Sequence, residues 1–194
     1  MGSLEAQGAD ICAKLARIRL LAMDVDGVLT DGTIGYDGQG AQQKRFHVAD
    51  GLGLVVLGQE GIAVAWVTGR RDAAVERRAA ELSVPYLLQG VRDKGRALRQ
   101  LAAQLELAPE EIAYIGDDWN DLTAFAVAGV RLAVANAAEE VKAQADLVTT
   151  RSGGLGAVRE VCESILEAHG RRGDAVAAYV AALCQGGDVP PSGQ

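Results

Sequence analysis

The stretch RLLAMDVDGVLTDG, from Arg19 to Gly32, begins as an apolar run and ends in carboxylates and glycines. The apolar half is typical of a buried strand. An unpaired carboxylate is expensive to bury, so Asp24 and Asp26 at the end of such a strand need a partner. Identifying that partner decides both the fold around this strand and what the chain does.

The composition predicts one α/β domain over residues 1–194. The chain of 194 residues is 49% hydrophobic, which is enough for one sizeable core. A net charge of −7 without a basic cluster argues against nucleic acid and against a membrane surface as partners. No apolar run reaches the length of a membrane span, and the N-terminus lacks the layout of a signal peptide. The scattered Cys12, Cys162 and Cys184 fit reduced thiols, so we expect a cytoplasmic location.

Apolar runs alternate with helical periods along the chain, which predicts a doubly wound, Rossmann-like parallel sheet flanked by helices. The strands are expected over residues 19–24, 62–67, 84–88, 112–116, 130–134 and 146–149. The helices are expected over residues 5–17, 51–60, 71–82, 94–106, 120–128, 137–144, 155–169 and 174–184. Residues 185–194 have no apolar period and are expected to form a flexible tail.

Residues 32–48 interrupt this alternation of strands and helices. Two runs of alternating polarity, 33–36 and 43–48, flank the turn sequence DGQG, which predicts a β-hairpin. Because the hairpin follows the first strand directly, it should project from the carboxyl end of the sheet, where ligands bind in open α/β folds. We interpret it as a small flap over that site, without a cap domain; a purely structural hairpin is the alternative.

Polar residues follow four of the predicted strands at their carboxyl ends. They are Asp24 and Asp26, then Thr68, then Lys94, and finally Asp117 with Asp118. Adjacent parallel strands lie about 4.8 Å apart, so these side chains can converge on one crevice. Each has a simpler explanation taken alone, such as an Asx turn, a plain connection, a solvated lysine or a helix cap. Their coincidence at one edge favours a functional site.

Clustered carboxylates need a hard cation, and Mg²⁺ accepts oxygen ligands from carboxylates, water and substrate phosphate. An aspartate beside such an ion can attack phosphorus, while a second protonates the leaving alcohol and then activates water. Thr68 and Lys94 are suited to neutralising phosphoryl oxygens. An EF-hand starting at Asp24 would need Gly and Glu where this chain has Leu29 and Gly35, and no P-loop pattern occurs.

Six motifs, in this order, resemble those of the haloacid dehalogenase superfamily of phosphotransferases. They are DVDGVLTDG, KRFHVADGLG, VTGR, VRDKG, AYIGDDWNDL and GGLGAVREV, and the resemblance covers about residues 18–170. The hairpin-to-helix motif and GGLGAVRE point further, to the cap-less branch of 3-deoxy-D-manno-octulosonate 8-phosphate phosphatases. The resemblance implies a phosphatase for an acidic sugar phosphate on the way to lipopolysaccharide. It also implies a homotetramer whose hairpins pack together and whose tails close neighbouring sites.

The resemblance also implies a role for each matching residue. Asp24 is then the nucleophile and Asp26 the general acid/base, with Thr68 and Lys94 positioning the phosphate. Mg²⁺ is then held by Asp24, the main-chain carbonyl of Asp26 and Asp117, with Asp118 and Asp121 in support. The substrate-binding residues by this resemblance are Arg70, Arg78, His47, Asp50, Gly51 and Asn120.

One position departs from the branch, because Ala49 stands where its members usually carry Arg. The missing guanidinium removes a contact worth about 1.5–3 kcal/mol. An acylneuraminate 9-phosphate or its deaminated relative is therefore an alternative substrate. A non-catalytic oligomerisation module of the same fold is a rival of another class, against which the retained Asp24 and Asp26 argue. For Trp119 we favour core packing over stacking on substrate, and for His47 either ligand contact or hairpin packing is open.

Overall fold

The structure, a computed structural model, describes residues 10–40 and 42–185 of the chain. Residues 10–15 are helical, as expected for the end of the first predicted helix, whose beginning at residues 5–9 lies outside the described residues. The predicted tail lies outside them as well, apart from Gln185.

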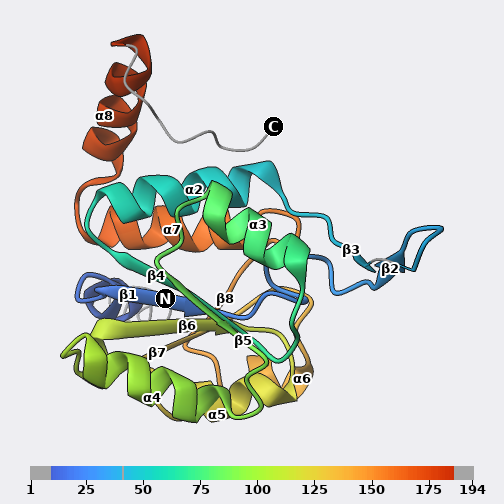
Figure 1. The fold of residues 1–194 in the computed structure, drawn as a ribbon. Helices are drawn as coiled ribbons and strands as arrows, with labels where there is room; N and C mark the ends of the chain where they lie inside the picture. Colours follow the sequence, from blue (N-terminus) through green and yellow to red (C-terminus); the bar gives the residue numbers. More distant parts are fainter. Residues whose placement is uncertain (1–9, 41, 186–194) are drawn as a thin grey trace.

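A six-stranded parallel sheet forms the centre of the molecule, in the order β5–β4–β1–β6–β7–β8 (Figure 1). Its strands are β1 (Leu20–Met23), β4 (Ala63–Thr68), β5 (Tyr86–Gln89), β6 (Ile112–Gly116), β7 (Val130–Ala133) and β8 (Leu147–Val148). Leu20 of β1 pairs with Ala63 of β4 on one side and with Ile112 of β6 on the other. Every residue of β1 is buried, which explains its continuous apolar run. The predicted α/β fold class is confirmed.

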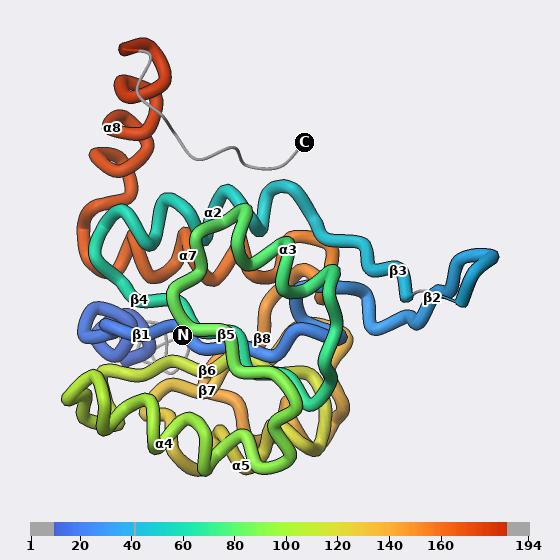
Figure 2. Tube along the Cα trace, viewed as in Figure 1, coloured from blue at the N-terminus to red at the C-terminus, as the bar shows by residue number. Residues whose placement is uncertain are grey.

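Helices cover both faces of the sheet (Figures 1 and 2). One face carries α2 (Val48–Gln59), α3 (Ala73–Glu81) and α7 (Ala157–Ala168), and the other carries α4 (Lys94–Gln104) and α5 (Leu122–Phe125). Two aspartates start helices beside the site: Asp72 accepts a hydrogen bond from Ala74 N and Asp93 accepts one from Arg96 N. The helices that follow strands therefore begin at the carboxyl edge of the sheet.

The remaining helical elements are short, apart from the last of them. They are η1 (Pro109–Glu111), η2 (Trp119–Asp121), α6 (Glu139–Lys142) and α8 (Arg172–Cys184). Figure 1 shows α8 extending away from the sheet beyond the end of α7. Among residues 10–40 and 42–185, no helix combines the length and the apolar character needed to cross a membrane.

Two predicted boundaries are wrong for physical reasons. The helix expected over 120–128 is the 3₁₀ turn η2 followed by the short α5, because the Asp121 carboxylate accepts hydrogen bonds from Asp117 N and Asp118 N and tightens the chain there. Helix α2 begins at Val48 rather than at residue 51. The sequence predicts an extended run over residues 43–48, but of these only Gln43 is paired in a sheet.

The hairpin after β1 is present but shorter than predicted. Its strands are β2 (Gly35–Tyr36) and β3 (Gln42–Gln43), which pair antiparallel and project from the body (Figure 1). The returning chain is anchored by Phe46, whose ring stacks on Trp66 of β4 with centroids 6.2 Å apart. The base of the hairpin is therefore packed on the domain.

Candidate active site

A cavity of 230 Å³ opens at the carboxyl ends of β1, β4 and β6. Its lining includes five of the residues predicted to converge there: Asp24, Asp26, Thr68, Asp117 and Asp118. It also includes Arg70 and Asn120, which the family resemblance predicted to bind substrate. Parallel strands deliver these residues to one edge, as the sequence pattern predicts. Lys94, the sixth, is not in the cavity lining but contacts Asp24 from the start of α4.

Lys94 is a buried cation held between carboxylates. Its Nζ lies 2.6 Å from Asp24 Oδ2 and 2.7 Å from Asp121 Oδ1, and its side chain is 1% exposed. A weaker hydrogen bond reaches Asn120 Oδ1 at 3.4 Å. Burial lowers the pKa of Lys94, but the charges of Asp24 and Asp121 outweigh it, so the pKa lies above its ordinary value. The ammonium group therefore stays charged beside the Asp24 carboxylate.

Asp121 organises the floor of the site. Its Oδ1 accepts hydrogen bonds from Lys94 Nζ and, at 2.8 Å, from the hydroxyl of Tyr114. Its Oδ2 accepts hydrogen bonds from the main-chain N–H groups of Asp117 at 2.9 Å and Asp118 at 3.2 Å. With two donors on each oxygen, Asp121 is a support for the neighbouring groups rather than a free ligand.

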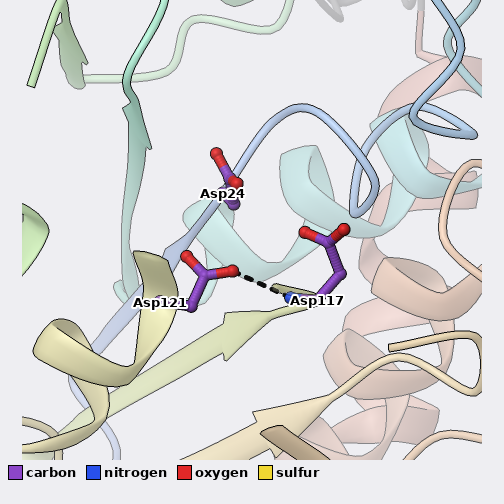
Figure 3. Close-up of side chains that lie close together, drawn as sticks. All are labelled: Asp24, Asp117 and Asp121. Carbon is purple, nitrogen blue, oxygen red and sulfur yellow. Dashed lines mark hydrogen bonds between the residues drawn. The ribbon is translucent and has the colours of Figure 1, made fainter. Parts of the chain in front are cut away.

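The side chains of Asp24, Asp117 and Asp121 lie close together (Figure 3). One oxygen from each of the three lies within 4.8 Å of the others. Burial and the charge of Asp121 raise the pKa of Asp24 to about 7, although Lys94 opposes the shift. Burial and the charges of Asp121 and Asp24 raise the pKa of Asp117 to about 8. The charged carboxylates repel one another at this distance, and a bound cation would offset the repulsion.

The donor set fits a divalent cation such as Mg²⁺. The buried Asp117 Oδ1 has no hydrogen-bond partner among the described residues. Within the described part of the chain, the one hydrogen-bond donor to Asp24 Oδ1 is Val25 N, at 2.7 Å. Gly27 makes room for this arrangement, because its φ is +90° and a Cβ there would lie 2.0 Å from Asp117 Oδ2. Since Asp121 is saturated by donors, Asp24 and Asp117 are the side chains that can hold the ion.

Thr68 and Arg70 form the opposite side of the cavity. Thr68 ends β4 and is 2% exposed, and its Oγ1 accepts a hydrogen bond from Arg70 N at 3.2 Å. A hydroxyl, the N–H groups of the strand-to-helix turn and a guanidinium are thus presented to the cavity. Groups of this kind bind the oxygens of a phosphoryl group.

Comparison with known proteins identifies the family. The sequence profile described as haloacid dehalogenase-like hydrolase matches residues 87–160. The 3-deoxy-D-manno-octulosonate 8-phosphate phosphatase KdsC of Escherichia coli (strain K12) is 44% identical over 167 residues, which are 86% of this chain and 89% of that relative. The chain belongs to the haloacid dehalogenase-like hydrolases.

Solved structures extend this likeness over the fold. The 3-deoxy-D-manno-octulosonate 8-phosphate phosphatase of Moraxella catarrhalis, in complex with magnesium, phosphate and KDO, aligns with a TM-score of 0.85 and 46% identity, covering 88% of this chain and 98% of that one. A HAD superfamily (subfamily III A) hydrolase of Legionella pneumophila aligns with a TM-score of 0.89 and 40% identity, covering 92% and 98%. The predicted membership of the superfamily is confirmed.

Four of the residues predicted from the family to bind substrate are not in the cavity lining: His47, Asp50, Gly51 and Arg78. Arg78 of α3 is 8% exposed, donates to Glu81 Oε2 at 3.2 Å and lies against Gly51 of α2. The buried Asp50 accepts a hydrogen bond from Arg159 N of α7 at 2.7 Å, and burial raises its pKa. His47 occupies the N-cap position of α2 without a side-chain capping hydrogen bond, and its buried Nδ1 has no partner in the described part of the chain. Their role in substrate binding stays a prediction.

Trp119 lies in the loop that links β6 to α5, and its favoured placement in the core is wrong. The indole is 65% exposed, and its Nε1 donates to Glu140 Oε2 at 3.0 Å. The side chain turns outward because Asp118 caps η2 and directs the next residue away from the carboxylate cluster. Trp119 therefore stands at the rim, beside Asp118 and Asn120 of the cavity lining.

Lys44 is a residue of the site that the motif analysis missed. It comes from the returning strand of the hairpin, and its buried ammonium pairs with the carboxylate of Asp26. The motif KRFHVADGLG contains this lysine, yet no role was assigned to it. The alternation of residues 42–46, in which Phe46 marks the inward face, was the signal that could have found Lys44.

Proposed function

We propose that this protein is a Mg²⁺-dependent phosphatase for the phosphate monoester of a sugar acid, with 3-deoxy-D-manno-octulosonate 8-phosphate as the favoured substrate. The observation that carries the proposal is Asp24, which is buried at the end of β1, contacts Lys94 and faces Asp117 across the cavity. The relatives that are 44% identical carry the name of this phosphatase activity.

The chemistry uses two aspartates in turn. Asp24 attacks phosphorus, so that its Oδ–P bond forms while the ester P–O bond breaks, and the leaving oxygen takes a proton from the Asp26 carboxyl group. Water then attacks the aspartyl-phosphate, Asp26 takes up a proton from that water, and the Asp24 carboxylate is restored as phosphate leaves. Thr68 and Lys94 contact the phosphoryl oxygens and offset their charge.

Asp24 and Asp117, with the main-chain carbonyl of Asp26, are the proposed metal ligands. When bound, Mg²⁺ offsets the mutual repulsion of the carboxylates and polarises the phosphoryl oxygens. Asp121 and Lys94 keep Asp24 oriented through the hydrogen bonds described above. The orphaned Asp117 Oδ1 supports this assignment.

The size of the cavity bears on the substrate. Ligand pockets usually enclose about 300–1,000 Å³, whereas this cavity measures 230 Å³. It accommodates the phosphoryl group, so the sugar acid extends past Arg70 and Asn120 of the lining toward the hairpin. The half-buried Ala49 on the first turn of α2 provides no guanidinium there, which favours testing a nine-carbon acylneuraminate 9-phosphate as the second substrate.

A homotetramer in the cytoplasm belongs to the same proposal. It is supported by the exposed Ile34 and Tyr36 on the hairpin, which are 54% and 62% exposed and give an apolar surface for a neighbouring subunit. Multi-angle light scattering of the purified protein distinguishes the tetramer from a monomer or dimer.

Phosphate release from a panel of sugar phosphates tests the proposal. The panel contains 3-deoxy-D-manno-octulosonate 8-phosphate, an acylneuraminate 9-phosphate, its deaminated analogue and neutral hexose phosphates, each with Mg²⁺ or with EDTA. We expect the acidic sugars to be hydrolysed fastest, and only with Mg²⁺. Equal and poor turnover of every ester would contradict the sugar-acid assignment, and undiminished activity in EDTA would contradict the metal.

A further inference from the structure

Residues 42–46 run in extended form along the edge of the cavity. Gln42, Lys44 and Phe46 are partly buried, while Gln43 and Arg45 are exposed, which is the period of two that an extended chain imposes. The stacking of Phe46 on Trp66 fixes which face turns inward. Lys44 is therefore directed to the body of the protein by the register of its segment.

The Lys44 ammonium lies between two carboxylates. Its side chain is 5% exposed and pairs with Asp26 Oδ1, and its Nζ lies 3.7 Å from Asp72 Oδ2. Asp72 is equally buried and is held in place as the N-cap of α3, where it accepts the N–H of Ala74 at 2.8 Å. The ammonium group thus connects the hairpin, the helix α3 and the loop after β1.

Gln42 reinforces this connection from the same face. In the amide orientation that satisfies both ends, its Nε2 donates to Asp72 Oδ2 at 2.9 Å and its Oε1 accepts from Arg70 Nη2 at 2.7 Å. Arg70 lines the cavity. The contacts of the returning strand therefore fall on the cavity edge rather than on a remote part of the fold.

We infer that Lys44 is a positioning residue that holds the Asp26 carboxyl group in its working orientation. The lysine occupies Oδ1, and the structure gives Oδ2 no partner among the described residues. Oδ2 is then the atom presented to the leaving oxygen and afterwards to water. This inference rests on the proposed function, because the importance of that orientation depends on Asp26 acting as the acid and base.

Two esters with different leaving groups distinguish a role of Lys44 in positioning Asp26 from a role in supporting the hairpin alone. An alkyl or sugar phosphate needs a proton on its leaving oxygen, whereas p-nitrophenolate leaves without one. The comparison is made on kcat/KM, which reports phosphoryl transfer to Asp24 and not the later attack of water that both esters share. A misplaced Asp26 therefore lowers kcat/KM far more for the first ester than for the second. A hairpin that loses its place altogether lowers kcat/KM equally for both.

The experiment compares Lys44→Met with Arg45→Met, its exposed neighbour on the same strand, in the presence of Mg²⁺. Lys44→Met is expected to lower kcat/KM for the best sugar phosphate by about tenfold or more, with kcat/KM for p-nitrophenyl phosphate little affected. Lys44→Arg, which keeps the cation, should recover most of the lost rate. Arg45→Met should behave as the unmodified protein does.

An equal loss of kcat/KM on both esters, or no loss at all, would overturn the inference while leaving the proposed function intact. If the unmodified protein hydrolyses neither ester, the proposed function fails and the inference fails with it. The two failures are thus told apart by the unmodified protein alone.

Discussion

Lys94 Nζ lies 2.6 Å from Asp24 Oδ2, and neither side chain is more than 6% exposed. The same ammonium group also meets Asp121 Oδ1 at 2.7 Å. One lysine therefore offsets two carboxylates that would otherwise be buried as uncompensated charges. Orientation of the proposed nucleophile and stability of the fold depend on the same contact.

Replacement of Lys94 by Met is expected to destabilise the protein as well as to inactivate it. Removing one partner of a buried ion pair costs about 3–5 kcal/mol of unfolding free energy. Urea unfolding monitored by circular dichroism measures this loss. Lys142→Met is the matched control, because the exposed pair of Lys142 with Glu139 should contribute no more than about 0.5 kcal/mol. A loss for Lys94→Met as small as that of the control would contradict the account.

The carboxylates of Asp24 and Asp117 should make the metal-free protein less stable as the pH rises. Their pKa values are raised from 3.8 to about 7 and about 8. Between roughly pH 4 and pH 8 the folded state binds more protons than the unfolded state, so the free energy of unfolding falls with increasing pH. Mg²⁺ bound to both carboxylates offsets this loss.

Thermal unfolding with Mg²⁺ and with EDTA tests this dependence. The increase in Tm caused by Mg²⁺ is expected to be larger near pH 8 than near pH 6. Asp117→Asn should weaken both the pH dependence and the response to Mg²⁺. A Mg²⁺ response that is the same at both pH values, in the unmodified protein, would argue against the shared site.

Asp146, far from the cavity, contributes to the free energy of unfolding with the opposite pH dependence. Partial burial raises its pKa, but hydrogen bonds from Arg131 N and Nε and the charge of Arg131 prevail, and the pKa falls to about 2. A lowered pKa gives stability that is present above the ordinary value of 3.8 and lost as the pH falls toward 2.

Asp146→Asn should therefore be less stable than the unmodified protein at neutral pH and should approach it in stability as the pH falls below about 4. Urea unfolding at a series of pH values measures the difference. Phosphatase activity at neutral pH is expected to be unchanged. A stability difference that stays constant down to pH 2 would show that the ion pair with Arg131 is not its source.

Gly153 supports the loop that carries Asp26. A Cβ on Gly153 would lie 1.7 Å from the main-chain oxygen of Gly27, so that the two backbones would have to separate. Gly153→Ala should lower the free energy of unfolding by about 1–3 kcal/mol and should lower kcat, because Gly27 adjoins Asp26. Gly173→Ala is the matched control: nothing lies within 4 Å of its added Cβ, and a gain of about 0.5 kcal/mol is expected. Equal effects of both substitutions on kcat would contradict this role of Gly153.

The part of the site that lies directly after strands was predictable. Asp24, Thr68 and Asp117 each follow an apolar run, and parallel strands bring such positions to one edge whatever the detail of the helices. Lys94 was predictable as well, because it opens a helix behind Asp93, which caps it. For these residues, position along the chain determines position in the fold.

Contacts that depend on local turns or on side-chain direction were not predictable to the same degree. The role of Asp121 as a hub depends on the 3₁₀ turn η2, which reads as ordinary helix in the sequence. Trp119 points outward for the same reason. Lys44 was overlooked because its strand is paired only at Gln42 and Gln43, although the spacing to Phe46 carries the information. Arg78 is basic and near the motifs, but α3 turns it toward Gly51.

The central claim is that Asp24 carries the phosphoryl group during turnover. Its most direct test is an acid-quenched reaction with the best sugar phosphate and Mg²⁺, followed by mass analysis of the peptide that contains Asp24. The account predicts a phosphoryl adduct on Asp24 in the unmodified protein, and neither adduct nor turnover in Asp24→Asn. Phosphate release at the unmodified rate by Asp24→Asn would contradict it.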